Sequence, residues 1–140
     1  MLRGFTLIEL VLVIAILGIL AIAALPALFN VSLTTAKNNS MTAVASAVQS
    51  SITLYGANQV AQGASSVSYP SALDSAAAGA ASGTAPLFGN VLQTPVTTEW
   101  IKKSPTCYIY DFNSTGSYAA GDTYFQYAPA TGTFLVVSSC

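Results

Sequence analysis

The most uniform hydrophobic pattern of the chain lies at its amino-terminal end. From Leu10 to Leu25 every residue is apolar or glycine, and most of the residues just before this run are apolar as well. An apolar run of about 20 residues is typical of a helix that crosses a lipid bilayer. The pattern therefore predicts a long apolar helix that can insert into a membrane.

A second pattern, with the period of an amphipathic helix, follows the apolar run. Its apolar residues are spaced by three and four positions, which places them on one face of a helix. The residues on this face are Met41, Val44, Val48, Ile52 and Tyr55. We expect one helix from about Phe5 to Tyr55 whose outer half packs on a globular head, with Gly56 as its stop.

The carboxy-terminal third shows the pattern of β-strands. Short runs rich in aromatic and β-branched residues begin at Thr106, Asp122 and Gly132, and turn-forming residues separate them. These runs predict an antiparallel sheet of three to four strands. Alternation along the second run places Phe125, with the residues two positions before and after it, on one face of the sheet. Tyr124 and Gln126 lie on the other face, and either set can face the helix.

Between helix and sheet the chain has no sustained hydrophobic period. Residues 57–86 are rich in Ala, Ser and Gly, which indicates a long surface connection or a flexible linker. Pro95 restricts any strand around it to a sheet edge. The fold class predicted from these patterns is α+β, with a long N-terminal helix packed on a small antiparallel sheet.

Composition and charge exclude several function classes. Of the 140 residues, 53% are hydrophobic, only 6% are charged, and the formal net charge is −1. Nucleic-acid-binding proteins usually carry a basic stripe, whereas the one basic cluster here is the pair Lys102–Lys103, which we interpret as part of a solvated turn.

An enzyme is the least supported class. The chain has no histidine, no glycine-rich phosphate loop and no cluster of metal ligands, so the sequence predicts no cofactor and no catalytic residue. Asp111 and Asp122 are too few to predict a calcium site, and we interpret them as turn-capping acids.

Glu9 is the unusual residue of the apolar segment. A carboxylate in mid-membrane costs about 2.5 to 3.5 kcal/mol on insertion scales, so a plain membrane anchor or a cleaved secretory signal gains nothing from it. The small residues around Ala21 and Ala23 do fit a secretory cleavage site. A third alternative is a segment designed to leave the membrane.

The stretch Gly-Phe-Thr-Leu-Ile-Glu at residues 4–9, after a short basic leader, resembles the processing motif of type IV prepilins and pseudopilins. The resemblance implies that a prepilin peptidase cuts between Gly4 and Phe5 and methylates the new amine of Phe5. It also implies that Phe5, Thr6 and Glu9 act in filament assembly, with Glu9 pairing with the amine of a neighbouring subunit. The alternative is that Glu9 caps its own helix.

Gly18 and Pro26 fall where many type IV pilins carry a glycine and a proline around a weakly helical stretch. Proline removes one helical hydrogen bond, and glycine lowers helix propensity by about 1 kcal/mol relative to alanine. The resemblance implies that this stretch melts when the subunit packs into a filament. A tolerated kink in a membrane helix is the other interpretation.

Two cysteines, Cys107 and Cys140, remain. Export would bring them to an oxidising compartment, so we expect one disulfide rather than two free thiols. The region they enclose is similar to the disulfide-bounded region of type IV pilins. Pseudopilins of type II secretion commonly stabilise the same region with calcium.

The predicted organisation divides the chain into a leader (1–4), an apolar helix (5–29), an amphipathic half of that helix (30–56), a connection (57–104) and a sheet region (105–140). The resemblance implies a ladle-like pilin fold and a structural subunit of a type IV pilus, with a pseudopilin as the alternative. Such fibres serve adhesion, twitching motility or DNA uptake.

The resemblance also implies where the chain lies and what it contacts. The subunit is in the inner membrane before assembly and in an extracellular filament afterwards. The implied partners are copies of the chain itself, the prepilin peptidase, and an inner-membrane assembly platform with its ATPase.

Overall fold

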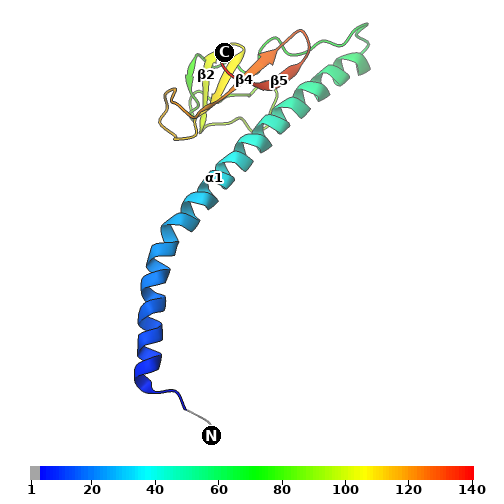
Figure 1. The fold of residues 1–140 in the computed structure, drawn as a ribbon. Helices are drawn as coiled ribbons and strands as arrows, with labels where there is room; N and C mark the ends of the chain where they lie inside the picture. Colours follow the sequence, from blue (N-terminus) through cyan, green and yellow to red (C-terminus); the bar gives the residue numbers. More distant parts are fainter. Residues whose placement is uncertain (1–3) are drawn as a thin grey trace. The chain divides into compact units, whose positions relative to one another are not determined.

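The structure, a computed structural model, describes residues 4–140, without the side chains of residues 24, 25 and 27–31. Two compact units divide the chain, one ending at Asn39 and the other spanning Ser40–Cys140, which we call the head. Helix α1, Leu7–Ala61, contributes to both units (Figure 1). The predicted α+β class is confirmed.

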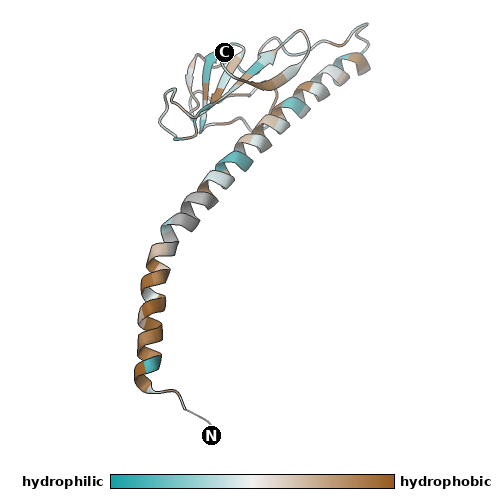
Figure 2. Cartoon of the chain, viewed as in Figure 1, coloured by the Kyte–Doolittle hydropathy of each residue, from teal (hydrophilic) through white to brown (hydrophobic). Residues whose placement is uncertain are grey.

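In the first unit, α1 is almost uniformly apolar from Leu7 to Leu25, whereas the residues from Asn30 to Asn39 are mostly polar. Glu9 lies in its first turn, and the apolar colouring of Figure 2 follows the helix from its start. Among the residues whose side chains are described, no helix is long and apolar enough to cross a membrane, so the expected membrane-spanning helix is not confirmed. Pro26 lies inside the helix, which continues through it.

The expectation that α1 stops at Gly56 is wrong. The helix ends at Ala61, and Gly63, with φ +96°, provides the left-handed residue of its C-terminal cap. The amide of Gly63 donates to the carbonyl of Val60 and that of Ala64 to the carbonyl of Gln59, which are the two bonds of a Schellman motif. Gly56 instead leaves space for a side chain, because a Cβ there would lie 2.9 Å from the ring of Tyr69.

The head contains a five-stranded antiparallel sheet in the order β1-β2-β3-β4-β5, one strand more than the upper prediction. Its strands are β1 (Gly79–Ala80), β2 (Trp100–Ser104), β3 (Cys107–Tyr110), β4 (Thr123–Ala128) and β5 (Thr133–Val137). The three strands expected from the sequence are β3, β4 and β5. The two additional strands precede them along the chain and extend the sheet on the β3 side.

One face of the sheet packs against the outer part of α1. Val48 and Ile52 of the helix are fully buried in the core, as the helical spacing predicts. Phe125 and Tyr127 of β4 belong to the same core, whereas Gln126 between them is exposed. The set of β4 side chains that includes Phe125 and Tyr127 therefore faces the helix.

Segments of the connection between α1 and β2 also enter the core, so a simple surface loop is a wrong description of them. Leu73, Leu87 and Phe88 are fully buried, and Leu87 pairs with Val96 in an isolated antiparallel bridge. Phe88 packs edge-on against Trp100 with 5.2 Å between ring centroids. The connection therefore supplies part of the hydrophobic core.

Candidate processing and assembly site

The backbone around the expected cleavage point is open. Gly4 to Thr6 precede the helix, and the side chain of Phe5 is 86% exposed. A Cβ at Gly4 would meet no described atom within 4 Å. None of the residues that the structure describes therefore blocks the approach of another protein to the Gly4–Phe5 bond.

Glu9 forms a capping box with Thr6 at the start of α1. The backbone amide and the hydroxyl of Thr6 donate to Oε2 of Glu9 over 3.0 and 2.9 Å. In return the amide of Glu9 donates to the Thr6 hydroxyl over 3.4 Å. These reciprocal bonds satisfy helix-terminal amides that would otherwise have no partner. The helix-capping role, which the sequence left open, is present in the structure.

Both of the bonds that Glu9 accepts from Thr6 use the same carboxylate oxygen. Within the described residues, no donor other than Thr6 reaches the Glu9 carboxylate. An ionised carboxylate accepts bonds on two oxygens, so Oε1 retains its capacity for a further donor. Capping its own helix and pairing with another amine are therefore compatible roles for Glu9.

The apolar side chains of this unit are exposed around the whole helix. Among the large apolar side chains of α1 between Leu7 and Ile22, the exposed fraction ranges from 49% at Val11 and Val13 to 81% at Leu7. Neighbouring positions of an α-helix point in directions about 100° apart, so no single buried face exists here. Gly18 has no described atom within 4 Å of a Cβ position. The described residues therefore do not bury this apolar surface, although burial of apolar surface is favourable.

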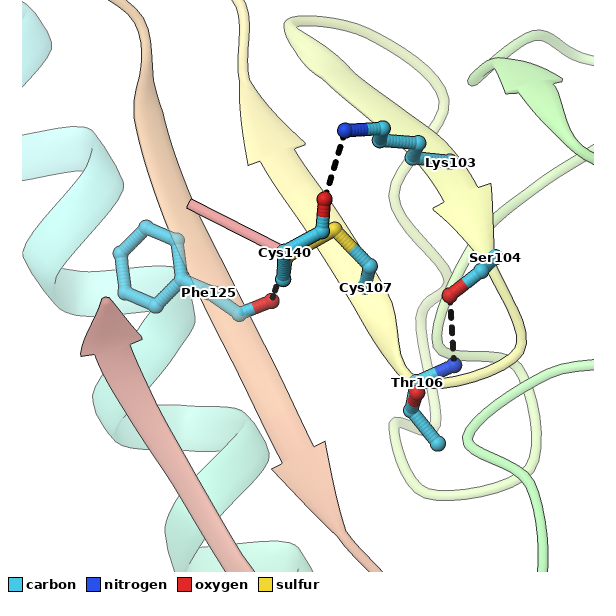
Figure 3. The surroundings of a disulfide bond; sticks show 6 residues. All are labelled: Lys103, Ser104, Thr106, Cys107, Phe125 and Cys140. Carbon is cyan, nitrogen blue, oxygen red and sulfur yellow. Dashed lines mark hydrogen bonds between the residues drawn. A yellow bond between two sulfur atoms is a disulfide. The ribbon is translucent and has the colours of Figure 1, made fainter. Parts of the chain in front are cut away.

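The two cysteines of the head form the expected disulfide. Cys107 begins β3, and the bond to Cys140 holds the carboxy-terminal residue across the sheet, with 5.7 Å between the Cα atoms (Figure 3). The ammonium group of Lys103 donates to the carbonyl of Cys140 over 2.6 Å. The same group lies 5.6 Å from the ring centroid of Tyr124.

The interpretation of Lys102–Lys103 as a solvated turn is wrong, because both residues lie in β2. Strand alternation exposes Lys103 and places Lys102 inside the head, where it is 6% exposed. The Lys102 ammonium forms a 2.6 Å ion pair with Asp74 and also donates to the carbonyl of Ala76 over 2.8 Å.

The hydroxyl of Tyr108 completes this buried network by donating to Asp74 over 2.8 Å. Burial raises the pKa of the Tyr108 phenol, and the hydrogen bond to the Asp74 carboxylate raises it further. The network joins the connection before β1 to strands β2 and β3. Lys102 lies two positions after Trp100, on the same face of the strand, and this spacing is the sequence signal that could have predicted an inward Lys102.

Asp111 and Asp122 cap turns. Asp111 accepts a 2.6 Å bond from the amide of Gly116, and Asp122 accepts bonds from the amides of Phe112 and Ala119. Burial alone would raise the pKa of Asp111, but backbone N–H donors of the following residues lower it overall. Within residues 4–140, no group of three or more acidic or sulfur side chains is arranged to hold a metal ion.

Comparisons with known proteins point to the amino-terminal site. Residues 3–25 match the sequence model of the family described as the prokaryotic N-terminal methylation motif. This motif is the prepilin signal of type IV pilins and pseudopilins. No curated protein and no solved structure matches the chain.

Proposed function

We propose that the chain is a structural subunit of a type IV pilus, which polymerises through the amino-terminal half of α1 into an extracellular filament. The match of residues 3–25 to the methylation motif carries this proposal. The exposed apolar surface of the same segment supports it, since polymerisation would bury that surface. The role is structural rather than enzymatic.

Maturation begins at the exposed Gly4–Phe5 bond. A prepilin peptidase removes the leader 1–4 and methylates the amine of Phe5. Before assembly the apolar segment holds the chain at the inner membrane, and an assembly platform with its ATPase then transfers it into the filament. Transfer from lipid to other apolar helices is close to balanced in free energy, so this work is supplied from outside the chain.

Glu9 sets the register between subunits. Its Oε2 remains on Thr6, and Oε1 accepts a bond from the Phe5 amine of a neighbouring subunit. A carboxylate surrounded by apolar helices is tolerated when it is paired and hydrogen-bonded. In the filament the stretch from Gly18 to Pro26 melts, because proline already removes one helical bond there and glycine weakens the helix.

A pilus subunit is favoured over a pseudopilin by how the head is stabilised. The disulfide holds the carboxy-terminal region. The carboxylate oxygens of Asp111 and Asp122 accept hydrogen bonds from backbone amides of their own turns. These carboxylates thus organise the loop between β3 and β4 through hydrogen bonds to its backbone. Long extracellular fibres in micrographs support the pilus, whereas short, cell-bound assemblies support the pseudopilin.

The direct test of this function compares Glu9→Gln with Thr6→Ala. Glu9→Gln removes the charge that pairs with the neighbouring amine, and we expect filaments on micrographs to fall at least tenfold while the folded head persists. Thr6→Ala removes the two hydroxyl bonds of the cap but keeps the Thr6 amide on Glu9 and the Glu9 charge; the cap contributes about 0.5 to 2 kcal/mol to the helix start, and we expect a milder loss. Equal numbers of filaments from Glu9→Gln and from the chain of unchanged sequence would contradict the pairing of Glu9 with the neighbouring Phe5 amine.

A further inference from the structure

Strand β5 lies at one end of the sheet and has one edge without a neighbouring strand (Figure 1). Its side chains Leu135 and Val136 are 60% and 61% exposed. Sheet edges of this kind are usually protected by a lysine, a proline or a bulge. Strand Thr133–Val137 contains neither residue, and its register with β4 runs without a shift. The edge therefore lacks the usual protection against pairing with another strand.

The register between β4 and β5 shows which backbone groups point towards this edge. Residues of an antiparallel strand alternate between bonding to the neighbouring strand and pointing away from it. The amide of Phe134 points away from β4, because it bonds to the side chain of Gln49. The amide of Tyr127, opposite Phe134, points away from β5, because it bonds to the carbonyl of Thr106. By alternation, the amide and carbonyl of Val136 also point outward.

Gln49 of α1 closes only the beginning of the edge. Its side chain accepts from the amide of Phe134 and donates to the carbonyl of Gly132, over 2.7 and 2.9 Å. Among the described residues, no group bonds to the outward amide or carbonyl of Val136. We call the part of the edge centred on Val136 the open β5 edge. An extended strand satisfies its donor and its acceptor together.

The side chains of the open β5 edge suit pairing with an identical strand. Val136 lies opposite Phe125, on the sheet face that packs on α1. Leu135 lies opposite the exposed Gln126, on the other face. An antiparallel pair centred on Val136 brings this residue opposite its own copy, and Leu135 opposite Val137 of that copy. Like charges opposite each other destabilise such pairs, and β5 contains no charged residue.

The ends of the two strands also match in this register. Gly132 and Phe134, which Gln49 covers, lie opposite residues 138–140 of the second copy. Those residues have already left the edge, since the Cys107–Cys140 bond carries the chain from β5 back across the sheet to β3. A longer strand would meet the Gln49 side chain. The length of β5 therefore fits the length of edge that Gln49 leaves open.

We propose that the open β5 edge of one head pairs with the open β5 edge of a second copy of the chain. The strands run antiparallel about a two-fold axis at Val136, and each Val136 amide donates to the Val136 carbonyl of the other copy. The two five-stranded sheets then form one continuous sheet.

This inference rests on the proposed filament and assigns a contact outside it. The two-fold axis is perpendicular to the sheet, so the parts of α1 that pack on the two sheets run in opposite directions. Subunits of one helical filament all point the same way. The paired β5 edges therefore join the heads of two filaments that lie side by side.

The test uses Val136→Cys in the full-length chain, assembled into filaments and mildly oxidised. Both native cysteines are in the disulfide, so the introduced thiol is the free one. Paired residues of this type have Cα atoms about 5.5 Å apart, which suits a disulfide, and we expect covalent dimers. The matched control is Thr133→Cys in the same strand. It should give no dimer, because the two copies of residue 133 lie about 20 Å apart along the pair.

Filaments of normal yield that give no Val136→Cys dimer, or equal dimer from Thr133→Cys, would overturn the contact and leave the filament function intact. A second variant, Val136→Lys, places like charges opposite each other. We expect its filaments at normal yield, with side-by-side association in micrographs at least tenfold rarer, whereas Thr133→Lys should leave association unchanged. Equal association of Val136→Lys filaments would also overturn the contact.

A chain that never forms filaments overturns the proposed function instead. The contact is then tested on the same two cysteine variants in detergent, where dimers from Val136→Cys alone support it and their absence overturns it.

Discussion

The amino-terminal half of α1 exposes its hydrophobic side chains, whereas the head buries many of its own. Leu7 and Ile8 are 81% and 77% exposed, whereas Val48 and Ile52 of the same helix are fully buried. The head buries its own core, whereas the large apolar side chains described in the amino-terminal half are exposed. In the proposed function, the head therefore determines stability and the amino-terminal half determines assembly.

The two regions also differ in how they satisfy a carboxylate. Glu9 bonds to Thr6, three residues away, whereas Asp74 bonds to Lys102 and Tyr108, which are 28 and 34 residues away. The partner of Glu9 within the chain is local, so its loss affects only the helix start. The partners of Asp74 connect distant segments, so their loss affects the whole head.

The largest expected effect on stability comes from Lys102→Met. This change leaves the Asp74 carboxylate buried without its counter-ion, which costs about 3 to 5 kcal/mol in the free energy of unfolding. Denaturant unfolding of the head, followed by circular dichroism, measures it. The control is Lys103→Met, which removes an exposed lysine from the next position of the same strand and should cost about 1 kcal/mol or less. Equal effects of the two changes would contradict the buried network.

The disulfide should have the next largest effect. Cys140→Ser opens a loop with a sequence separation of 33 residues. In the chain-entropy model this lowers the free energy of unfolding by about 3 to 4 kcal/mol. The measurement is the shift in denaturation midpoint against the unmodified chain, both without reductant. Treatment of the chain of unchanged sequence with a reductant should reproduce the shift. An unchanged midpoint in both experiments would contradict a stabilising role of the disulfide.

Gly132→Ala tests the packing between the β4–β5 turn and the connection. Gly132 has φ +66°, and an added Cβ would lie 2.4 Å from the ring of Tyr69. Displacing this ring should cost about 1 to 3 kcal/mol in unfolding free energy. Gly121→Ala is the matched control, because Gly121 also has a positive φ, +100°, and a Cβ there meets nothing within 4 Å. A Gly132→Ala head as stable as the control would show that Tyr69 is not held in this position.

The smallest effect concerns acid stability. Because the folded-state pKa of Asp111 lies below its unfolded value of about 3.9, its ionised form stabilises the head above that pH. This contribution is lost as the pH falls through the folded-state pKa. Asp111→Asn should therefore reduce the decline of stability below about pH 4, with a difference of roughly 1 kcal/mol at neutral pH. Identical pH profiles for both proteins would rule out this role of Asp111.

Local signals predicted the parts of the structure that depend on local interactions. The buried positions Val48 and Ile52 and the disulfide follow from helical spacing and the cysteine count. Helix capping by Glu9 was one of two interpretations that the sequence left open, and its partner Thr6 is known from the structure. The strands from Cys107 onwards carry the β-branched and aromatic residues that strands prefer.

Long-range interactions explain what the sequence patterns did not predict. Strand β2 contains two adjacent lysines, which resemble a solvated turn until Asp74 is placed beside Lys102. Gly56 resembles a helix stop, but it is needed for the approach of Tyr69, whereas Gly63 forms the cap. The hollow lined by Leu54 and Asn58 of α1 together with Asn90 depends on how distant segments pack, which no short motif encodes.

The intact mass of the purified filament protein tests the central claim most directly. The account predicts a chain that lacks residues 1–4, carries one added methyl group on Phe5 and has two hydrogens fewer than the reduced sequence. These values report cleavage, methylation and the Cys107–Cys140 bond in one spectrum. A chain that retains residues 1–4 would contradict the account.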